Sequence, residues 1–263
     1  MQFTKLNDIT LHYQLIGAPE GKPIIVFANS LGADFRMWRD VIVQLIGDYS
    51  IITYDKRGHG LSDAPPAPYS IDDHVNDLAA LLDHLKVKDA IICGLSVGGL
   101  IAQGLSLARP DLVKALVLCN TAHKIGDEAL WNERIDAVKQ GGIASICDGV
   151  MARWFSENYR KSNSAEVDGY RNMLGCMPLE GYIGTCAAIR DADFTKQVPA
   201  LNVPTLCVGS SEDVTTPPAR VRELAKLVSG AYFEVIEGAG HLTSIEKPDM
   251  LFDIIQAFLQ GLE

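Results

Sequence analysis

The chain has 263 residues, of which 48% are hydrophobic and 21% are charged, and its formal net charge is −10. A chain this long and this apolar can bury a large core, which excludes an intrinsically disordered protein. The excess of 33 acidic over 23 basic residues repels polyanions, which argues against a nucleic acid or an anionic membrane as a partner.

The six cysteines are widely separated and form neither a C-x-x-C pair nor any metal-ligand spacing, so no metal site is predicted. We interpret them as reduced core residues, although an even number leaves disulfides open. The N-terminus lacks the apolar segment of a signal peptide, and no run of about 18 apolar residues occurs. These features predict a cytoplasmic protein.

Short apolar runs alternate with segments of helical period, which predicts an α/β fold with one mostly parallel sheet of eight strands. Residues 3–6 and 9–16 are expected to form an opening hairpin around Asn7-Asp8. The other six strands are expected at Ile24–Ala28, Ser50–Tyr54, Ala90–Cys93, Ala115–Cys119, Thr205–Val208 and Tyr232–Ile236.

Helix signals lie between these runs. Ser70 is a good N-cap for a helix that ends near Leu85, and Pro248 suits the first turn of a helix that reaches the C-terminus. From Ala122 to Lys196 no strand is expected, and helices are predicted at Leu130–Lys139, Ile143–Phe155, Ala165–Met177 and Leu179–Ala188. The chain therefore divides into a core domain, residues 1–121 and 197–263, and a helical cap, residues 122–196.

A D-x-R-G-x-G-x-S run follows the strand Ser50–Tyr54, from Asp55 to Ser62. We interpret Asp55 and Arg57 as residues that stabilise this loop. His59 could serve as a base, but it belongs to the loop signature, so a structural role is favoured.

The strand ending at Cys93 leads into Gly94-Leu95-Ser96-Val97-Gly98 and then into the helical stretch Leu100–Ala108. This G-x-S-x-G pattern between a strand and a helix predicts a nucleophile elbow, in which the Ser96 Oγ stands clear of the turn at the carboxyl end of the sheet. The alternative is a glycine-rich turn with an incidental serine.

A nucleophilic serine needs a base, and the base needs an orienting acid. Asp213 follows the strand Thr205–Val208, and His241 follows the strand Tyr232–Ile236. The order Ser96, Asp213, His241 is the order in α/β-hydrolases, so these three residues are predicted to be catalytic. Glu212 competes for the role of the acid.

The elbow, the order of these three residues and the D-x-R-G-x-G-x-S loop together resemble the α/β-hydrolases over essentially the whole chain. Within that superfamily the chain resembles the 3-oxoadipate enol-lactonases. The narrower resemblance depends on Asn29-Ser30-Leu31-Gly32, Phe35-Arg36-Met37-Trp38, Gly94–Gly99 and Arg153-Trp154-Phe155.

An oxyanion hole needs two N–H donors, and we expect them from the backbone of Val97, after the nucleophile, and of Leu31. Many α/β-hydrolases have His-Gly at the positions of Asn29 and Ser30. This small polar pair is therefore expected beside the hole, in contact with the substrate. A purely structural turn is the alternative.

The resemblance implies hydrolysis of an enol-lactone to 3-oxoadipate through an acyl-enzyme on Ser96, a step of the β-ketoadipate pathway of aromatic catabolism. A small anionic lactone as substrate calls for a cation in the pocket. Arg134 and Arg153 are the candidates because they flank Trp131 and Trp154, which could form an apolar wall. Alternatively, the tryptophans fix the cap to the core and the arginines are solvated.

Other functions stay open at this point. A carboxylesterase or a cofactor-free perhydrolase would use the same three residues, and a ligand-binding protein of hydrolase fold would not turn over. No metal or organic cofactor is indicated. The sequence leaves a homo-oligomer open.

Overall fold

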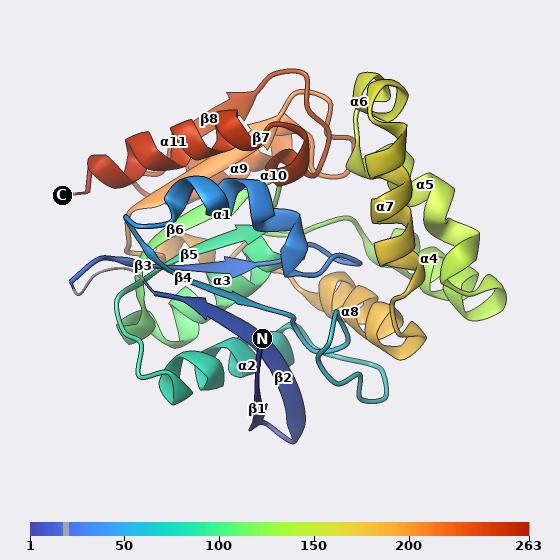
Figure 1. Cartoon of the computed structure of the whole chain (residues 1–263), viewed down its shortest axis with the longest axis horizontal. Coiled ribbons are helices and arrows are strands. Elements are labelled where there is room, and N and C mark those ends of the chain that lie inside the picture. Colours follow the sequence, from blue (N-terminus) through green and yellow to red (C-terminus); the bar gives the residue numbers. More distant parts are fainter. Residues whose placement is uncertain (18–20, 263) are drawn as a thin grey trace.

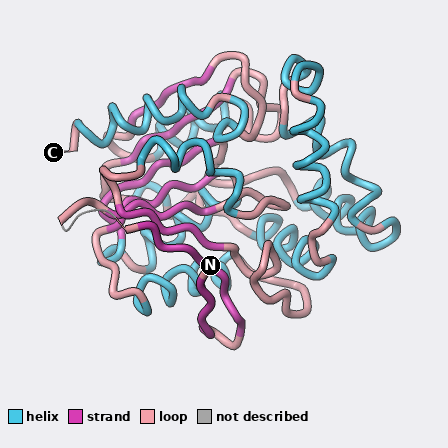
Figure 2. The backbone as a smooth tube through the Cα atoms, viewed as in Figure 1, coloured by secondary structure: helices cyan, strands magenta, loops and turns pink. Residues whose placement is uncertain are grey.

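The computed structural model describes residues 1–17 and 21–262. Eight strands form one sheet in the order β1-β2-β4-β3-β5-β6-β7-β8 (Figures 1 and 2). β2 is antiparallel to β1 and β4, and all other neighbours are parallel. The strands are β1 (Gln2–Leu6), β2 (Ile9–Ile16), β3 (Ile24–Ala28), β4 (Ser50–Tyr54), β5 (Ala90–Leu95), β6 (Val113–Cys119), β7 (Thr205–Ser210) and β8 (Tyr232–Ile236). The predicted mostly parallel sheet of eight strands is confirmed.

Helices cover both faces of this sheet, which is why every residue of β5 and of β7 is buried. α1 (Arg39–Leu45) and α11 (Pro248–Gln260) pack together on one face. α2 (Ile71–His84), α3 (Val97–Ala108) and α9 (Pro218–Leu227) cover the other (Figure 1). The short helix α10 (Thr243–Glu246) precedes α11. Because β3 to β8 run parallel, their carboxyl ends lie at one edge of the sheet.

Local sequence signals predicted the first residue of α2 correctly but not that of α3. Ser70 caps α2 as expected, with a capping box in which its hydroxyl accepts from the backbone N–H of Asp73. α3 begins at Val97, immediately after Ser96, and not at Leu100 as expected. The glycines after Val97 have low helix propensity, but close packing against the sheet keeps this segment helical, so α3 begins earlier than its local sequence suggests.

Between β6 and β7 the fully described segment contains helices and no strand, as predicted. We refer to these helices as the cap and to the rest of the chain as the core. The cap helices lie beyond the carboxyl ends of the strands (Figure 1), and α8 also contacts α2 of the core. The bounds are α4 (Glu128–Gly141), α5 (Cys147–Trp154), α6 (Glu157–Ser162), α7 (Ser164–Gly175) and α8 (Leu179–Asp191).

The single helix predicted at Ile143–Phe155 is wrong in detail. A 3₁₀ turn at Ile143–Ile146 precedes α5, and Phe155 adopts an extended conformation that ends it. Ser156 then caps the short helix α6, which was not predicted from the sequence. The Ser156 hydroxyl accepts from the N–H of Tyr159, and serine is a preferred N-cap residue, so its presence at this position is the signal that could have revealed α6.

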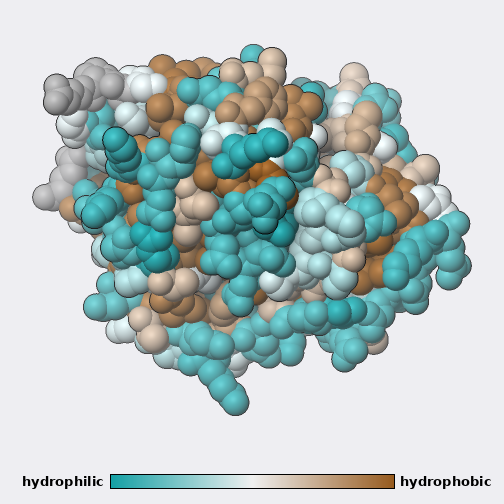
Figure 3. All heavy atoms as spheres, turned by 90° about the horizontal axis from the view of Figure 1, so that it is seen from below, coloured by the Kyte–Doolittle hydropathy of each residue, from teal (hydrophilic) through white to brown (hydrophobic). Residues whose placement is uncertain are grey.

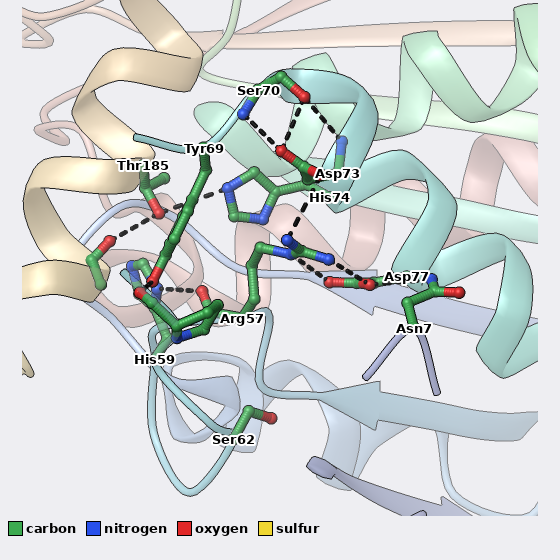
Figure 4. A network of polar contacts seen from close by, with 12 residues as sticks. Asn7, Arg57, His59, Ser62, Tyr69, Ser70, Asp73, His74, Asp77 and Thr185 are labelled. Atoms are coloured by element: carbon green, nitrogen blue, oxygen red, sulfur yellow. Dashed lines mark hydrogen bonds and ion pairs between the residues drawn. The ribbon is translucent and has the colours of Figure 1, made fainter. Parts of the chain in front are cut away.

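The loop from Asp55 to Ser62 is held by a buried polar network (Figure 4). Arg57 forms two hydrogen bonds with Asp77 of α2, at 2.6 and 2.8 Å, and Asn7 donates to the same carboxylate at 3.0 Å. Asp55 instead accepts from His12 Nδ1 at 2.7 Å. Arg57 and Asp55 therefore stabilise the loop through separate partners.

Hydrophilic side chains cover much of the molecular face in Figure 3, where hydrophobic residues form separate small areas. Among the described helices, none combines the length and the apolar character that a membrane crossing requires.

Candidate active site

Ser96 lies in the sharp turn between β5 and α3. Its backbone has φ 60° and ψ −120°, a conformation that is costly for a residue with a side chain. The turn is so tight that a Cβ on Gly94 would lie 2.2 Å from the carbonyl oxygen of Gly98. A Cβ on Gly98 would lie 2.1 Å from the carbonyl oxygen of Ala28 in β3. The two glycines of the motif are therefore required by close backbone approach.

The end of β6 and the residues directly after it hold this strained turn in place. The Ser96 N–H donates to the carbonyl of Cys119 at 3.0 Å, and the hydroxyl of Thr121 donates to the carbonyl of Ser96 at 2.7 Å. Ser96 is 5% exposed, and its side chain lines a cavity between the core and the cap. The backbone thus presents this hydroxyl to the cavity.

Asp213 and His241 meet at the same edge of the sheet, on the loops after β7 and β8. His241 Nδ1 lies 2.8 Å from Asp213 Oδ2, and both side chains are buried. With Nδ1–H donating to the carboxylate, Nε2 is the acceptor nitrogen. His241 lines the same cavity as Ser96. The competing acid Glu212 is exposed at the surface.

Burial alone would raise the pKa of Asp213, but His241 and two further donors hold it below its ordinary value. Asn120 Nδ2 donates to the carboxylate at 3.0 Å, and the hydroxyl of Thr216 donates to it at 2.7 Å. Asp213 is therefore ionised at neutral pH. Neither Asn120 nor Thr216 was predicted from the sequence; the position of Asn120, directly after β6, is the signal that could have revealed it.

The loop after β3 forms a tight turn from Ser30 to Ala33. The Ala33 N–H donates to the carbonyl of Ser30 at 3.4 Å, and Gly32 has φ +80°, which a glycine adopts without strain. Within the described residues the N–H of Leu31 has no protein acceptor. Val97 is the first residue of α3, where the N–H has no intrahelical acceptor. Both expected donors are therefore free.

His59 is fully buried beneath this turn and is outside the cavity lining. Its Nε2 accepts from the N–H of Gly32 at 3.1 Å, and its Nδ1 lies 3.2 Å from the carbonyl of Arg57. Burial, together with the charge of Lys56, holds the pKa of His59 well below its usual range. A neutral imidazole that supports the turn agrees with the structural role.

The cavity beside Ser96 and His241 has a volume of about 180 Å³. Pockets for drug-sized ligands measure about 300–1,000 Å³, so this one suits a compact molecule. The predicted contact residues Ser30, Trp131, Arg134, Arg153 and Trp154 all line it, together with Leu31, Val150, Tyr182 and Thr215.

Asn29 is not among these lining residues. Its amide donates to the carbonyl of Tyr54 at 2.8 Å and accepts from Trp38 Nε1 at 3.1 Å, and it is 1% exposed. Asn29 therefore ties β3 to its neighbours, and the expected substrate contact does not form because both ends of the amide are occupied.

Arg134 and Arg153 differ from most arginines of the chain, which pair with carboxylates. Arg134 donates to the hydroxyl of buried Tyr182 at 3.2 Å. Arg153 is exposed, and within the described residues it forms no ion pair. Two cations without carboxylate partners thus face one small cavity. No cluster of three or more metal-binding side chains occurs in the described part of the chain.

Comparisons with known proteins agree with this geometry. A family model described as the alpha/beta hydrolase fold matches residues 23–142. The 3-oxoadipate enol-lactonase 2 of Acinetobacter baylyi is 32% identical over 97% of this chain and 94% of its own length. The chain belongs to the α/β-hydrolase family.

The structural likeness extends over the cap as well as the core. The crystal structure of the enol-lactonase from Burkholderia xenovorans is 34% identical, with a TM-score of 0.95 over 98% of this chain and all of that one. A putative carbamate hydrolase, RutD of Rhizobium rhizogenes, is 26% identical over 95% of this chain and 98% of its own. This α/β-hydrolase thus shares its full architecture with the enol-lactonase from Burkholderia xenovorans.

Proposed function

We propose that this α/β-hydrolase opens 3-oxoadipate enol-lactone, or a closely similar small anionic lactone, by a Ser-His-Asp mechanism. The observation that carries the proposal is the cavity itself. It joins Ser96 and His241 to Arg134 and Arg153, two guanidinium groups without carboxylate partners. The enol-lactonase relatives, similar over nearly the whole chain, support the same substrate class.

The first half of the reaction acylates the serine. His241 Nε2 takes the hydroxyl proton of Ser96 while Oγ attacks the ring carbonyl. The N–H groups of Leu31 and Val97 stabilise the tetrahedral oxyanion. The ring C–O bond then breaks, and the leaving enol oxygen receives the proton from His241. The enol oxygen is less basic than an alkoxide, so it leaves more readily, and the released enol then tautomerises to a ketone.

The second half releases the acid. His241 takes a proton from water, whose oxygen attacks the acyl carbon, and collapse of the second oxyanion returns the proton to Ser96 Oγ. Asp213, ionised and held by Asn120 and Thr216, keeps Nδ1–H of the imidazole in place and stabilises its protonated form. The free carboxylate of the substrate binds at Arg134 and Arg153.

A panel of substrates tests this proposal. We expect kcat/KM for 3-oxoadipate enol-lactone to exceed that for 4-nitrophenyl acetate by at least about 100-fold, because only the lactone gains charged hydrogen bonds of about 1.5–3 kcal/mol each. Loss of the enol-lactone chromophore and release of 4-nitrophenol provide the two rates.

Other outcomes would contradict the lactonase proposal. A preference for neutral aryl esters would indicate a carboxylesterase, and peroxide-dependent halogenation would indicate a perhydrolase. Binding of lactones without turnover would indicate a ligand-binding protein.

A further inference from the structure

Lys56 is a fully buried lysine whose ammonium group contacts the oxyanion turn. It follows β4 and is 1% exposed. Its Nζ lies 2.6 Å from the carbonyl oxygen of Ser30 and 3.5 Å from that of Ala33. Within the described residues it forms no ion pair with a carboxylate. Burying an ammonium without a direct counter-ion is costly, so its presence calls for a functional reason.

The carbonyl that Lys56 binds belongs to the same peptide group as the N–H of Leu31. In a planar trans peptide the C=O and N–H bonds point in opposite directions. A donor fixed on the Ser30 oxygen therefore fixes the direction of the Leu31 N–H. A positive charge at that oxygen also polarises the peptide group and makes its N–H a stronger donor.

We propose that Lys56 is a positioning residue of the oxyanion hole, which aims and strengthens the Leu31 N–H through the Ser30–Leu31 peptide. This inference rests on the proposed function, because it needs Ser96 as nucleophile and Leu31 as donor. Lys56 is not among the residues that line the cavity, so it acts through the peptide and not on the substrate.

Maintenance of the turn alone does not account for Lys56. The Ser30 carbonyl already accepts from the Ala33 N–H, and His59 Nε2 already accepts from the Gly32 N–H at 3.1 Å. The turn is thus closed and supported without a cation. An apolar side chain of the same length would fill the space without the cost of a buried charge.

The charge of Lys56 depends on pH in the neutral range. Burial lowers the pKa of Lys56 to about 7, against the carboxylates of Asp55 and Asp34, which raise it. The other titratable groups near it are His59 and His74, whose own pKa values are lowered first by burial and then by the Lys56 charge. At pH 6 the ammonium form predominates, and the native state bears the cost of the buried charge.

The decisive variant is Lys56→Met, assayed on 4-nitrophenyl acetate at pH 6. We expect kcat to fall at least about tenfold, because loss of a complete oxyanion donor costs about 10²–10³ and here the donor is only weakened. KM should stay within about twofold. The melting temperature should not fall below that of the wild type, because a buried charge has been removed.

Arg57→Met is the matched control from the same loop. It leaves the buried Asp77 carboxylate without its cationic partner, so the melting temperature should drop by about 10 °C. The folded protein should keep its kcat, because the Arg57 side chain contacts neither the oxyanion turn nor the cavity. Lys56→Met should thus lose kcat and keep its melting temperature, whereas Arg57→Met should lose melting temperature and keep its kcat.

The pH dependence of stability gives a second readout. The folded pKa of Lys56 lies below its unfolded value of about 10.4, so the unfolded chain binds more protons between about pH 7 and 10. The destabilising effect of the buried Lys56 charge should therefore diminish as pH rises through this window, so wild-type stability should increase. Relative to wild type, Lys56→Met should melt highest at pH 6 and lose this advantage towards pH 9.

Several results would overturn the inference. An unchanged kcat in folded Lys56→Met would do so. If Lys56→Met unfolds or melts like Arg57→Met, the test moves to Lys56→Gln, which keeps a donor without the charge and should restore stability. Full kcat in Lys56→Gln would then refute a role for the charge. A wild-type protein that neither cleaves the ester nor is labelled at Ser96 by diethyl 4-nitrophenyl phosphate overturns the proposed function, and the inference with it.

Discussion

Arg153 presents a guanidinium group that no carboxylate of the described chain neutralises, at the rim of the cavity that contains Ser96. Arg134, which is partly buried and lines the same cavity, is oriented by its hydrogen bond to the hydroxyl of Tyr182. A free carboxylate on the substrate would complete the hydrogen bonding of both cations. The binding energy from this end can then hold the lactone carbonyl near the serine.

Arg153→Met tests this role at the residue scale. Removal of one charged hydrogen bond of about 1.5–3 kcal/mol should raise KM for the enol-lactone about tenfold or more, while KM for 4-nitrophenyl acetate stays within about twofold. Steady-state kinetics on both substrates provides the comparison.

Arg160→Met is the control for this experiment. Arg160 is also in the cap, but it donates to the carbonyl of Phe155 and does not line the cavity. It should leave both KM values unchanged. Equal increases for both substrates in Arg153→Met would contradict an anion-binding role.

The positions of residues that directly follow strands could be predicted from the sequence, whereas their hydrogen-bond partners far away in the sequence could not. Ser96, Asp213 and His241 could be located because each follows a strand in a recognisable motif. The bond from Asn120 to Asp213 joins residues 93 positions apart, and the bond from Lys56 to Ser30 joins residues 26 apart. Such contacts depend on the order of strands in the sheet, which local patterns do not contain.

At the scale of elements, the cap is fastened to the loop that carries His241. Glu246 at the end of α10 accepts from the N–H of Gly240 at 2.9 Å, from the N–H of Ser156 at 3.1 Å and from the Ser156 hydroxyl. The Leu242 N–H donates to the carbonyl of Trp154 at 3.0 Å. One carboxylate thus joins the junction of α5 and α6 to the loop after β8.

Glu246→Ala should break this connection. Two buried N–H groups would lose their acceptor, so we expect the free energy of unfolding to fall by about 2–4 kcal/mol. We also expect a lower kcat, because the His241 loop becomes less well fixed. Urea unfolding followed by circular dichroism measures the stability change.

Glu212→Ala provides the comparison, since Glu212 lies on an exposed loop of the same region. Its removal should change the unfolding free energy by no more than about 0.5 kcal/mol. If Glu246→Ala were equally neutral, the connection between cap and core would not depend on this carboxylate.

The elements themselves were largely predictable because their signals are local. Strand runs and the Ser70 cap agreed with the structure, whereas the region Ile143–Ser162 did not. There α5 ends at Trp154, whose carbonyl accepts from the N–H of Leu242 on the loop that carries His241. Periodicity of apolar residues cannot reveal a helix end that a tertiary contact imposes.

At the scale of the whole molecule, the net charge of −10 and the proposed anionic substrate are compatible because binding is a local matter. Charges across the surface are screened over about 8–10 Å at physiological salt. Inside a small cavity, two guanidinium groups outweigh the average field of the chain. The overall charge therefore affects binding of nucleic acids and anionic membranes, whereas the charges inside the cavity determine which small ligand binds.

The most direct test of the account compares wild-type protein with Ser96→Ala on 3-oxoadipate enol-lactone. We expect the wild type to turn over at about 1–10³ s⁻¹, and the variant to lose at least about 10⁴-fold in kcat while its circular dichroism spectrum and melting curve stay those of the wild type. A folded Ser96→Ala protein that keeps activity within about tenfold of the wild type would contradict the account.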